Sequence, residues 1–456
     1  MKKTYHIVVF GCQMNKNDSE RMATYLENLG FSEESVREKA DLVLFTTCGV
    51  RGSAESRIYG IIPKLKKINP NNVIVLTGCL SQRADVQKIL KKSVDIWMNI
   101  IDLPKLHDLL PERLKAKNAE EVFKVHGIRK ESYFSIEAKR QSTFAAYVPI
   151  GNGCDNFCTY CVVPYARGRE VYRPAEEIVA EVKDLIAKGY KEINLIAQNV
   201  NSYNSLAPVA CPPLEERGSP AGEGVRGDVV NFPELLKMVN DIPGEFWLRF
   251  STNHPKDMSE ELIKAVAECD KVCRHIHVPA QSGSNEILQR MNRKYTREHY
   301  LDLIKKIRKE LDAELPVAIT TDIIVGFPGE TEEHFLDTTK LFEEVEFDMA
   351  YVSEYSSRPG TAAEKMGDDV TDEVKKERAQ RLESILEKII KKRNEQYLGK
   401  TVEMLVEGIN KRGEWYGKTR AGKVIKMNKR IKAEAGDFVM VKIVKIRNFG
   451  FEADEV

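Results

Sequence analysis

The stretch Gly153-Cys-Asp-Asn-Phe-Cys-Thr-Tyr-Cys-Val-Val-Pro164 places three thiols, Cys154, Cys158 and Cys161, in one short loop. The spacing C-x3-C-x2-C is too close for a disulfide network and too regular for unrelated core cysteines. Thiolates are soft ligands that select iron–sulfur clusters, zinc or copper(I). Structural zinc sites and simple electron-transfer [4Fe–4S] centres use four ligands, but no Cys or His occurs in the next forty residues. The loop therefore predicts a three-thiolate cluster with one open iron, the alternative being three unrelated buried thiols.

Cys12, Cys48 and Cys79 share a second pattern. Each follows a short apolar, β-branched run that ends in a turn-forming residue, and each precedes a helical pattern. Alternating strands and helices predict a parallel sheet, and groups just beyond the carboxyl ends of its strands converge on one crevice. We expect these three cysteines to face one another and to form a second three-thiol metal site. The alternative is three small residues in tight strand–helix turns.

Length and cysteine content set the class of protein. The chain has 456 residues, too many for one ordinary domain, and its apolar fraction of 42% is enough for real cores. With no secretory segment and no apolar run long enough for a bilayer, we expect a cytoplasmic protein without a membrane partner. In that reducing compartment we expect its nine cysteines to be metal ligands or reactive thiols in preference to forming disulfides. Cys211 reads as an incidental exposed thiol, and Cys269 and Cys273 as buried packing.

The hydrophobic pattern predicts an α/β chain of three domains. Residues 1–115 read as a small parallel α/β domain, 140–395 as a central domain and 397–456 as a small β-barrel, with a charged linker at 113–142. The central domain contains six strand-like runs separated by amphipathic helices, at 145–150, 192–197, 246–250, 275–278, 317–325 and 349–355. Six β/α units predict a (β/α)6 partial TIM barrel, with its site at the carboxyl ends of the strands. The C-x3-C-x2-C loop follows the first strand, where that rule expects it.

Polar clusters follow several later strands of this barrel, at 198–201, 251–254, 281–284 and 320–322. Any one of them could be ordinary turn chemistry, but their recurrence indicates a binding site. A stretch at 204–230, rich in Pro and Gly, predicts a mobile loop. Residues 371–396 predict one long helix with an apolar side and a basic side.

The C-terminal barrel carries a concentrated positive charge. The whole chain has a formal charge of only +1, yet residues 411–432 hold nine Lys or Arg against one acid, Glu414. Trp415, Tyr416 and Phe449 lie among or near these cations. Aromatic rings that stack on bases, with Lys or Arg on phosphates, are typical of RNA-binding surfaces.

The cysteine loop, with Tyr160 before its last cysteine, resembles the signature of the radical S-adenosylmethionine enzymes. The order of the three domains resembles that of the methylthiotransferases within that superfamily, and the match covers nearly the whole chain. The stretches that carry the resemblance are Gly11–Glu20, Asn199–Tyr203, His277–Gly283, Asp322–Thr331 and Tyr355–Thr361. The first of these resembles the branch that modifies tRNA. Thr47, Asn253 and the insertion at 204–230 depart from the family pattern without removing a ligand.

The resemblance implies cofactors and their ligands. It implies two [4Fe–4S] clusters: one on Cys154, Cys158 and Cys161 that binds and cleaves S-adenosylmethionine, and an auxiliary one on Cys12, Cys48 and Cys79 that carries the sulfur. It also implies a radical core for the central domain and a TRAM barrel at the C-terminus. The expected S-adenosylmethionine pocket consists of Tyr160, Gln198, Asn199, Gln281, Ser282 and Asp322. Arg167 and Arg169 contact cofactor or RNA phosphate, or else form structural ion pairs.

The implied reaction adds a methylthio group to C2 of N6-isopentenyladenosine next to the tRNA anticodon (position 37 of the tRNA), where the target base is expected to flip out. A C–H bond there offers no acid–base handle, so a cofactor radical must perform the hard step. Expected partners are the anticodon stem-loop, a low-potential electron donor and a sulfur donor, and the enzyme is expected to be a monomer. The alternatives are a methylthiotransferase for N6-threonylcarbamoyladenosine or for a ribosomal protein, a non-catalytic iron–sulfur RNA-binding protein, and a zinc protein that binds RNA.

Overall fold

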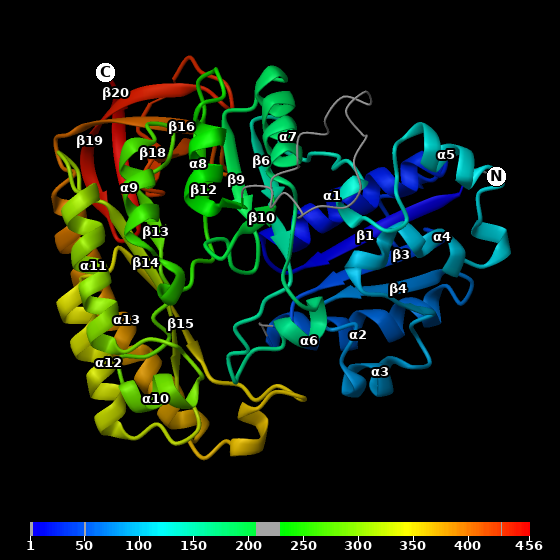
Figure 1. Ribbon diagram of the computed structural model, residues 1–456, viewed down its shortest axis with the longest axis horizontal. Helices are drawn as coiled ribbons and strands as arrows, with labels where there is room; N and C mark the ends of the chain where they lie inside the picture. Colours follow the sequence, from blue (N-terminus) through cyan, green and yellow to red (C-terminus); the bar gives the residue numbers. More distant parts are fainter. Residues whose placement is uncertain (1–2, 50–51, 207–228, 430) are drawn as a thin grey trace, which may run out of the picture. The chain divides into compact units, whose positions relative to one another are not determined.

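The structure is a computed structural model that describes residues 3–49, 52–206, 229–429 and 431–456 (Figure 1). The chain forms two compact units, each made of several segments. Unit 1 consists of Met1–Ser142, Asn152–Val171 and Ser356–Gly367, and unit 2 of Thr143–Gly151, Tyr172–Tyr355 and Asp368–Val456. Among the helices of the described residues, none combines the length and the apolarity needed to cross a membrane.

Unit 1 is built on a five-stranded parallel sheet, which confirms the predicted N-terminal α/β fold. Its strands have the order β2-β1-β3-β4-β5, and every pair is parallel. The central strands β3 and β4 are buried along their whole length, as expected for apolar runs covered on both faces. The bounds are β1 (Thr4–Phe10), α1 (Gln13–Asn28), β2 (Ser32–Glu33), β3 (Leu42–Thr47), α2 (Gly52–Ile68), β4 (Val73–Gly78), α3 (Ala84–Leu90) and β5 (Ile96–Trp97).

The segment expected to be a charged linker, 113–142, is instead part of the core of unit 1. It follows η1 (Ile100–Lys105) and α4 (Leu106–Leu109), begins within η2 (Glu112–Leu114), and contains α5 (Ala119–Val125) and η3 (Tyr133–Ser135). Phe123, Tyr133 and Ile136 are almost fully buried and belong to the same apolar cluster as Tyr25 of α1. The linker interpretation was wrong because the charges cover only the outer side of a segment whose apolar residues face inward.

Unit 2 contains the six predicted strands, β6 (Ala145–Pro149), β9 (Glu192–Ile196), β12 (Trp247–Phe250), β13 (His275–His277), β14 (Ala318–Val325) and β15 (Met349–Glu354). They pair in parallel as β6-β9-β12 and β13-β14-β15. A parallel bridge between Leu248 and Val272 joins the two groups. The strand order follows the chain, so the (β/α)6 partial barrel is confirmed.

Helices alternate with these strands in unit 2 (Figure 1). Their bounds are α7 (Ala175–Ala187), α8 (Phe232–Asn240), α9 (Glu260–Glu268), α10 (Asn285–Arg290), α11 (Arg297–Leu311), α12 (Glu332–Val345) and α13 (Asp372–Glu395). The Thr371 side chain caps α13 by accepting a hydrogen bond from the Val374 amide, so the long helix begins where the sequence predicts. Strands β10 (Asn204–Leu206) and β11 (Val229–Asn231) pair with each other, while most of the predicted loop, with Cys211, lies outside the described residues.

The C-terminal part of unit 2 is a closed five-stranded barrel, as predicted. Its strands β16 (Thr401–Ile409), β17 (Trp415–Thr419), β18 (Val424–Met427), β19 (Phe438–Arg447) and β20 (Gly450–Glu455) close in the order β16-β17-β18-β20-β19. Leu405 of this barrel packs with Trp247 of β12 and with Cys273. Cys269 and Cys273 are both buried, which confirms their predicted packing role.

Candidate active site

The sheet of unit 1 brings the N-terminal cysteines to neighbouring strand ends. Cys48 and Cys79 directly follow β3 and β4, and Cys12 follows β1 by two residues. Because β3 pairs with both β1 and β4, the three thiols lie at adjacent carboxyl ends, as the sequence predicts. Gly78, the last residue of β4 and the neighbour of Cys79, adopts φ +84°, and a Cβ there would lie 2.4 Å from the Thr47 carbonyl oxygen of β3. Only glycine fits this close approach.

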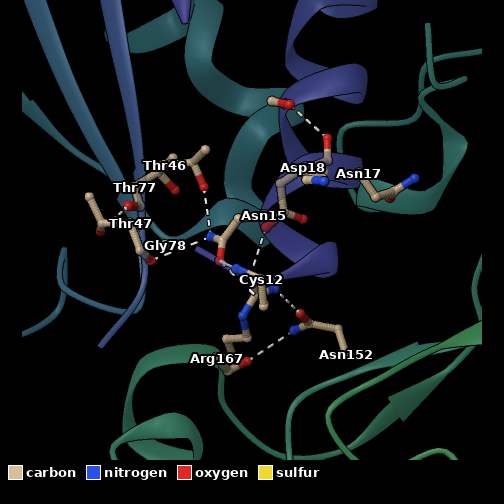
Figure 2. Close-up of polar contacts among 12 residues, drawn as sticks. Cys12, Asn15, Asn17, Asp18, Thr46, Thr47, Thr77, Gly78, Asn152 and Arg167 are labelled. Atoms are coloured by element: carbon tan, nitrogen blue, oxygen red, sulfur yellow. Dashed lines mark hydrogen bonds and ion pairs between the residues drawn. The ribbon is translucent and has the colours of Figure 1, made fainter. Parts of the chain in front are cut away.

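Asn15 holds the backbone around Cys12. The Cys12 amide donates a hydrogen bond to Asn15 Oδ1 at 3.1 Å, and Asn15 Nδ2 donates to Thr46 Oγ1 of β3 at 2.9 Å (Figure 2). Thr47, where the family pattern has Asn, donates through Oγ1 to the Thr77 carbonyl at 2.8 Å. These bonds tie the start of α1 to the ends of β3 and β4.

The C-x3-C-x2-C loop is also part of unit 1. Gly153 precedes it with φ +87°, and a Cβ at Gly153 would lie 2.1 Å from the Arg169 carbonyl oxygen. After Cys161 the chain enters the short helix α6 (Val163–Arg167). The Val163 amide points to Cys161 Sγ at 3.4 Å, and Asn156 Nδ2 lies 3.5 Å from Cys154 Sγ. Such N–H···S bonds are among the features that tune iron–sulfur clusters.

The two sets of cysteines meet inside unit 1. A Cβ added at Gly49, the residue after Cys48, would lie 2.7 Å from Val162 Cγ2 and 3.0 Å from Cys79 Cβ. Burial raises the pKa of the Cys161 thiol, and the charges at Cys158, Cys154 and Cys79 raise it further. Cys79 of one set is therefore within electrostatic reach of Cys161 of the other. A bound metal reverses this effect, because a cation deprotonates its thiol ligands.

The donor set fits iron–sulfur clusters. None of the eight cysteines in the described part of the chain forms a disulfide, so the thiols of both sets can serve as ligands. No three His, Cys, Asp or Glu of the described residues converge as they would around one metal ion. Ligands of a single ion such as zinc converge on one point, whereas the thiolates of a [4Fe–4S] cluster each bind a different iron. Three soft ligands in each set suit two such clusters, and in the loop set N–H donors are also directed at the sulfurs of Cys154 and Cys161.

Five of the six residues expected to bind S-adenosylmethionine lie in unit 2. Gln198 and Asn199 follow β9, Gln281 and Ser282 follow β13, and Asp322 lies within β14. Tyr160 belongs to unit 1 with the cysteine loop. Gln281 has φ +67°, and its backbone is hydrogen-bonded to β14. Its amide donates to the Asp322 backbone carbonyl at 2.8 Å, and its carbonyl accepts from the Ile324 amide at 2.9 Å. Asp322 Oδ2 lies 3.2 Å from His277 Nε2.

Two buried amide oxygens at these strand ends lack a protein partner. Asn199 and Asn253 are each 3% exposed. Asn199 Nδ2 donates to Asp257, and Asn253 Nδ2 donates to the His277 carbonyl, both at 2.9 Å, which fixes the two amide orientations. The Oδ1 atom of each accepts no hydrogen bond. Because a buried acceptor without a donor is unfavourable by about 1–3 kcal/mol, the pair suits a ligand that donates hydrogen bonds.

The two arginines after the loop take different roles. Arg167 forms a buried ion pair with Asp18 at 2.7 Å, and Arg169 pairs with Asp155 at 3.0 Å while its side chain remains 72% exposed. The sequence did not single out Asp18, Asn152 or Tyr133, which complete the Arg167 network. A polar residue in an amphipathic helix gives no sign that its partner lies far along the chain.

The basic stretch of the C-terminal barrel is divided between packing and surface. Lys423 pairs with Asp348 at 2.8 Å, Lys418 pairs with Glu192 at 3.0 Å, and Arg420 lies over the Trp247 ring. These cations hold the C-terminal barrel against the strands of the central barrel. Other cations surround a pocket of about 490 Å³, beside the exposed ring of Phe449. The pocket is lined by Val424, Lys426, Lys445, Ile446, Arg447, Asn448, Phe449, Gly450 and Phe451.

Comparisons with known proteins agree with this architecture. Residues 148–342 match the Radical SAM superfamily, residues 4–99 match the Uncharacterized protein family UPF0004, and residues 395–454 match the TRAM domain. Among solved structures, the radical S-adenosylmethionine methyltransferase TsrM from Kitasatospora setae, with cobalamin and a [4Fe–4S] cluster bound, is similar in fold. Its TM-score is 0.53 at 16% identity, over 80% of this chain and 77% of that chain.

Curated relatives match over nearly the full length. The tRNA-2-methylthio-N(6)-dimethylallyladenosine synthase of Clostridium novyi is 42% identical over 99% of this chain and 96% of its own. The enzyme of the same name from Thermoanaerobacter pseudethanolicus is 45% identical over 92% of this chain and 86% of its own. The predicted enzyme class, with S-adenosylmethionine and [4Fe–4S] clusters as cofactors, is thereby confirmed. The chain belongs to the family of tRNA-2-methylthio-N6-dimethylallyladenosine synthases, within the radical S-adenosylmethionine superfamily.

Proposed function

We propose that this protein adds a methylthio group to C2 of N6-isopentenyladenosine next to the anticodon of tRNA. The observation that carries the proposal is that two sets of three cysteines, none in a disulfide, lie in one unit, where Gly49 beside one set contacts Val162 beside the other. One three-thiolate set would serve radical formation alone. Two sets match a reaction that must both activate a C–H bond and deliver sulfur.

The cysteines are assigned by their position in the chain. Cys154, Cys158 and Cys161 hold the cluster that binds S-adenosylmethionine, and Cys12, Cys48 and Cys79 hold the auxiliary cluster. When bound, the clusters and S-adenosylmethionine supply the radical that takes hydrogen from the base and the sulfur that replaces it. The chain's own residues fix both cysteine sets through close glycine contacts at Gly78 and Gly153.

The strand ends of unit 2 bind the organic part of S-adenosylmethionine. The Oδ1 atoms of Asn199 and Asn253 accept hydrogen bonds from ligand donors such as an ammonium or ribose hydroxyls. Gln198, Gln281, Ser282 and Asp322 lie on or after neighbouring strands of the same barrel. Tyr160, in the cysteine loop of unit 1, keeps its expected role as an adenine contact. Asn253 is an addition to the pocket residues expected from the sequence.

The C-terminal barrel binds the tRNA. Phe449 presents a ring that is 55% exposed, on which an unpaired base can stack. The side chains of Arg447 and Lys445 are about half or more exposed beside the largely buried Glu452, so both cations can also reach a phosphate from the solvent side. We place the RNA contact at this pocket and at the exposed Lys411 and Arg412, because Lys418, Arg420 and Lys423 are engaged in packing.

The setting of the reaction completes the proposal. The protein acts in the cytoplasm as a monomer, its substrate is the anticodon stem-loop, and it takes electrons from a low-potential donor and sulfur from a separate donor. We assign sulfur delivery to residues 1–115, radical formation to residues 140–395 and RNA binding to residues 397–456. The segment between the first two packs in the core of unit 1 with the N-terminal sheet.

Anaerobically reconstituted protein tests the proposal directly. With S-adenosylmethionine, dithionite and tRNA that carries isopentenyladenosine, it should form 5′-deoxyadenosine and 2-methylthio-N6-isopentenyladenosine, detected by mass spectrometry of the nucleosides. A Cys158→Ala variant should form neither product. Equal turnover by the two proteins would contradict the mechanism, and a methylthio group found only on threonylcarbamoyladenosine or on a ribosomal protein would contradict the substrate.

A further inference from the structure

A buried ion pair joins the two cysteine sets of unit 1. Arg167 Nη2 lies 2.7 Å from Asp18 Oδ2, and the two side chains are 2% and 0% exposed. Asp18 lies in the second turn of α1, the helix that begins directly after Cys12. Arg167 ends α6, which begins two residues after Cys161. The pair therefore links the segment after one auxiliary ligand to the segment after one ligand of the radical cluster.

Both partners are held in place by further hydrogen bonds. The Tyr133 hydroxyl donates to Asp18 Oδ1 at 2.6 Å. Arg167 Nη1 donates to Asn152 Oδ1 at 2.9 Å, and Asn152 Nδ2 donates back to the Arg167 carbonyl at 3.1 Å. Figure 2 shows Asn152 bonded to Arg167 in this way, with Cys12 and Asp18 of α1 close by. A side chain fixed at both ends cannot turn away when a neighbouring charge changes.

The electrostatic surroundings of Arg167 include the auxiliary ligands. Burial by itself lowers the pKa of this guanidinium, but the Asp18 carboxylate and the thiolates of Cys79 and Cys12 raise it well above its usual range. Arg167 is thus within electrostatic reach of two of the three auxiliary cysteines, although it belongs to the other cysteine segment. A [4Fe–4S] cluster on three thiolates is negatively charged, and more so when reduced. A nearby fixed cation therefore favours the reduced state and raises the reduction potential.

We propose that Arg167 is a positioning residue that sets the reduction potential of the auxiliary cluster on Cys12, Cys48 and Cys79, with Asp18 opposing its charge. The inference rests on the proposed function, which places a cluster at these cysteines. Arg167 raises the potential because its charge stabilises the reduced cluster, and Asp18 lowers it for the opposite reason. Removing one partner or the other must shift the potential in opposite directions. A merely structural role predicts that both variants loosen the site alike.

The test is a redox titration of the full chain. Substitution of Cys154, Cys158 and Cys161 by Ala removes the radical cluster, so that electron paramagnetic resonance reports the auxiliary cluster alone. In this background we compare the ratio of oxidised to reduced auxiliary cluster at the midpoint potential of the parent protein. Arg167→Met should raise this ratio tenfold, which for one electron is a shift of the midpoint by about 59 mV to more negative potential. Asp18→Asn should lower the ratio by about the same factor, with the potential moving upward.

Two controls separate charge from packing. Tyr133→Phe removes a hydrogen bond to Asp18 but no charge, and it should change the ratio by less than twofold. Arg393→Met breaks a comparable buried ion pair, with Asp348 at 3.0 Å, in unit 2, whereas all six cysteines belong to unit 1. It should lower the melting temperature and leave the potential unchanged.

The outcomes are distinct for this inference and for the proposed function. Shifts of the same sign in Arg167→Met and Asp18→Asn, or no shift in either, would overturn the role of Arg167. Should Arg167→Met fail to fold, Asp18→Asn decides by its sign, together with Arg167→Lys, which keeps the charge and should stay within threefold of the parent. An unmutated chain that forms both nucleoside products while the variants keep the parent potential would overturn this inference and leave the proposed function standing. If the two variants shift the potential in opposite directions but the unmutated chain forms no nucleoside product, the role of Arg167 stands and the proposed function is overturned.

Discussion

Lys423 and Asp348 form a buried ion pair at 2.8 Å between the C-terminal barrel and the start of β15 in the central barrel. Burial is the main influence on both groups. It lowers the pKa of Lys423 and would raise that of Asp348, but the charges of Lys423 and Arg393 hold the Asp348 pKa below its usual value. A lysine from the most basic stretch of the chain therefore stabilises the fold and is not available to RNA.

Replacing Lys423 should separate stability from RNA binding. Lys423→Met leaves Asp348 with Arg393 as its remaining cation, and we expect a loss of about 2 kcal/mol in unfolding free energy, because a buried carboxylate loses one of its partners. Thermal unfolding measures the loss. Lys411→Met, an exposed position in the same stretch, should leave stability within about 0.5 kcal/mol and weaken tRNA binding. The reverse result would place the RNA contact on the buried side.

The exposed ring of Phe449 is expected to stack on a base. Phe449→Ala should weaken binding of an anticodon stem-loop by about tenfold, since one stacked base contributes about 1–3 kcal/mol, with no change in the dependence on salt. Arg447→Gln should instead reduce the salt dependence by about one phosphate contact. Fluorescence anisotropy at several salt concentrations measures both. Val444→Ala changes another exposed apolar side chain, on β19, and as the matched control it should bind like the unmutated chain.

The two cysteine sets should fail in different ways. Cys79→Ala removes an auxiliary ligand, so the protein should still cleave S-adenosylmethionine to 5′-deoxyadenosine but transfer no methylthio group. Cys158→Ala should abolish both reactions. Iron analysis should show about half the parent content in each variant. Methylthio transfer by Cys79→Ala at the parent rate would exclude a role for the auxiliary cysteines.

The glycine before the cysteine loop should be needed to form the radical cluster. A Cβ at Gly153 would lie 2.1 Å from the Arg169 carbonyl oxygen, in backbone that cannot easily move. Gly153→Ala should therefore lower the iron content to that of Cys158→Ala. Gly189 has a similar φ of +89° but open space around it, so Gly189→Ala carries only the backbone strain and should keep its iron. Equal iron in both alanine variants would show that the close contact at Gly153 is unimportant.

A buried histidine makes the fold sensitive to mild acid. Burial, together with the charges of Arg293 and Lys256, lowers the pKa of His254 to about 2, while an unfolded histidine titrates near 6.5. Below about pH 6.5 the unfolded chain binds the extra proton, so this contribution to stability is complete above that pH and is lost as pH falls, by about 1.4 kcal/mol per unit. Thermal unfolding at pH 7.5, 6.5 and 5.5 should show the decline.

His254→Asn should make that decline shallower by about 1.4 kcal/mol per pH unit below pH 6.5, because no proton is then taken up at this position on unfolding. Part of the decline should remain, because burial also lowers the pKa of His275 to about 3. His299→Gln, an exposed histidine on α11, should leave the pH dependence as it is. An unchanged slope in His254→Asn would assign the acid sensitivity to other groups.

Much of the fold could be predicted from the sequence because its signals are local. The runs before Cys12, Cys48 and Cys79 are apolar and β-branched, and periodicity marks the intervening helices, so the parallel sheet followed directly. The spacing of apolar residues over 371–396 predicted α13, and the structure adds that Thr371 caps its first turn. The segment 113–142 was misread because its surface charges outnumber the few apolar residues, such as Phe123 and Tyr133, that decide its packing.

The sequence by itself determined the chemistry of this protein, since thiol ligands with a spacing of C-x3-C-x2-C and three strand-end cysteines specify soft metal sites wherever they fold. Only the tertiary structure decided which partners surround them. Arg167 had an ion pair as an open alternative, and its partner Asp18 lies 149 positions away. Lys423 belongs to the basic stretch that is expected to contact RNA, but its ion pair with the buried Asp348 makes it part of the fold. The physical reason is that charge and burial depend on contacts between distant parts of the chain, whereas ligand spacing and strand patterns are properties of a few neighbouring residues.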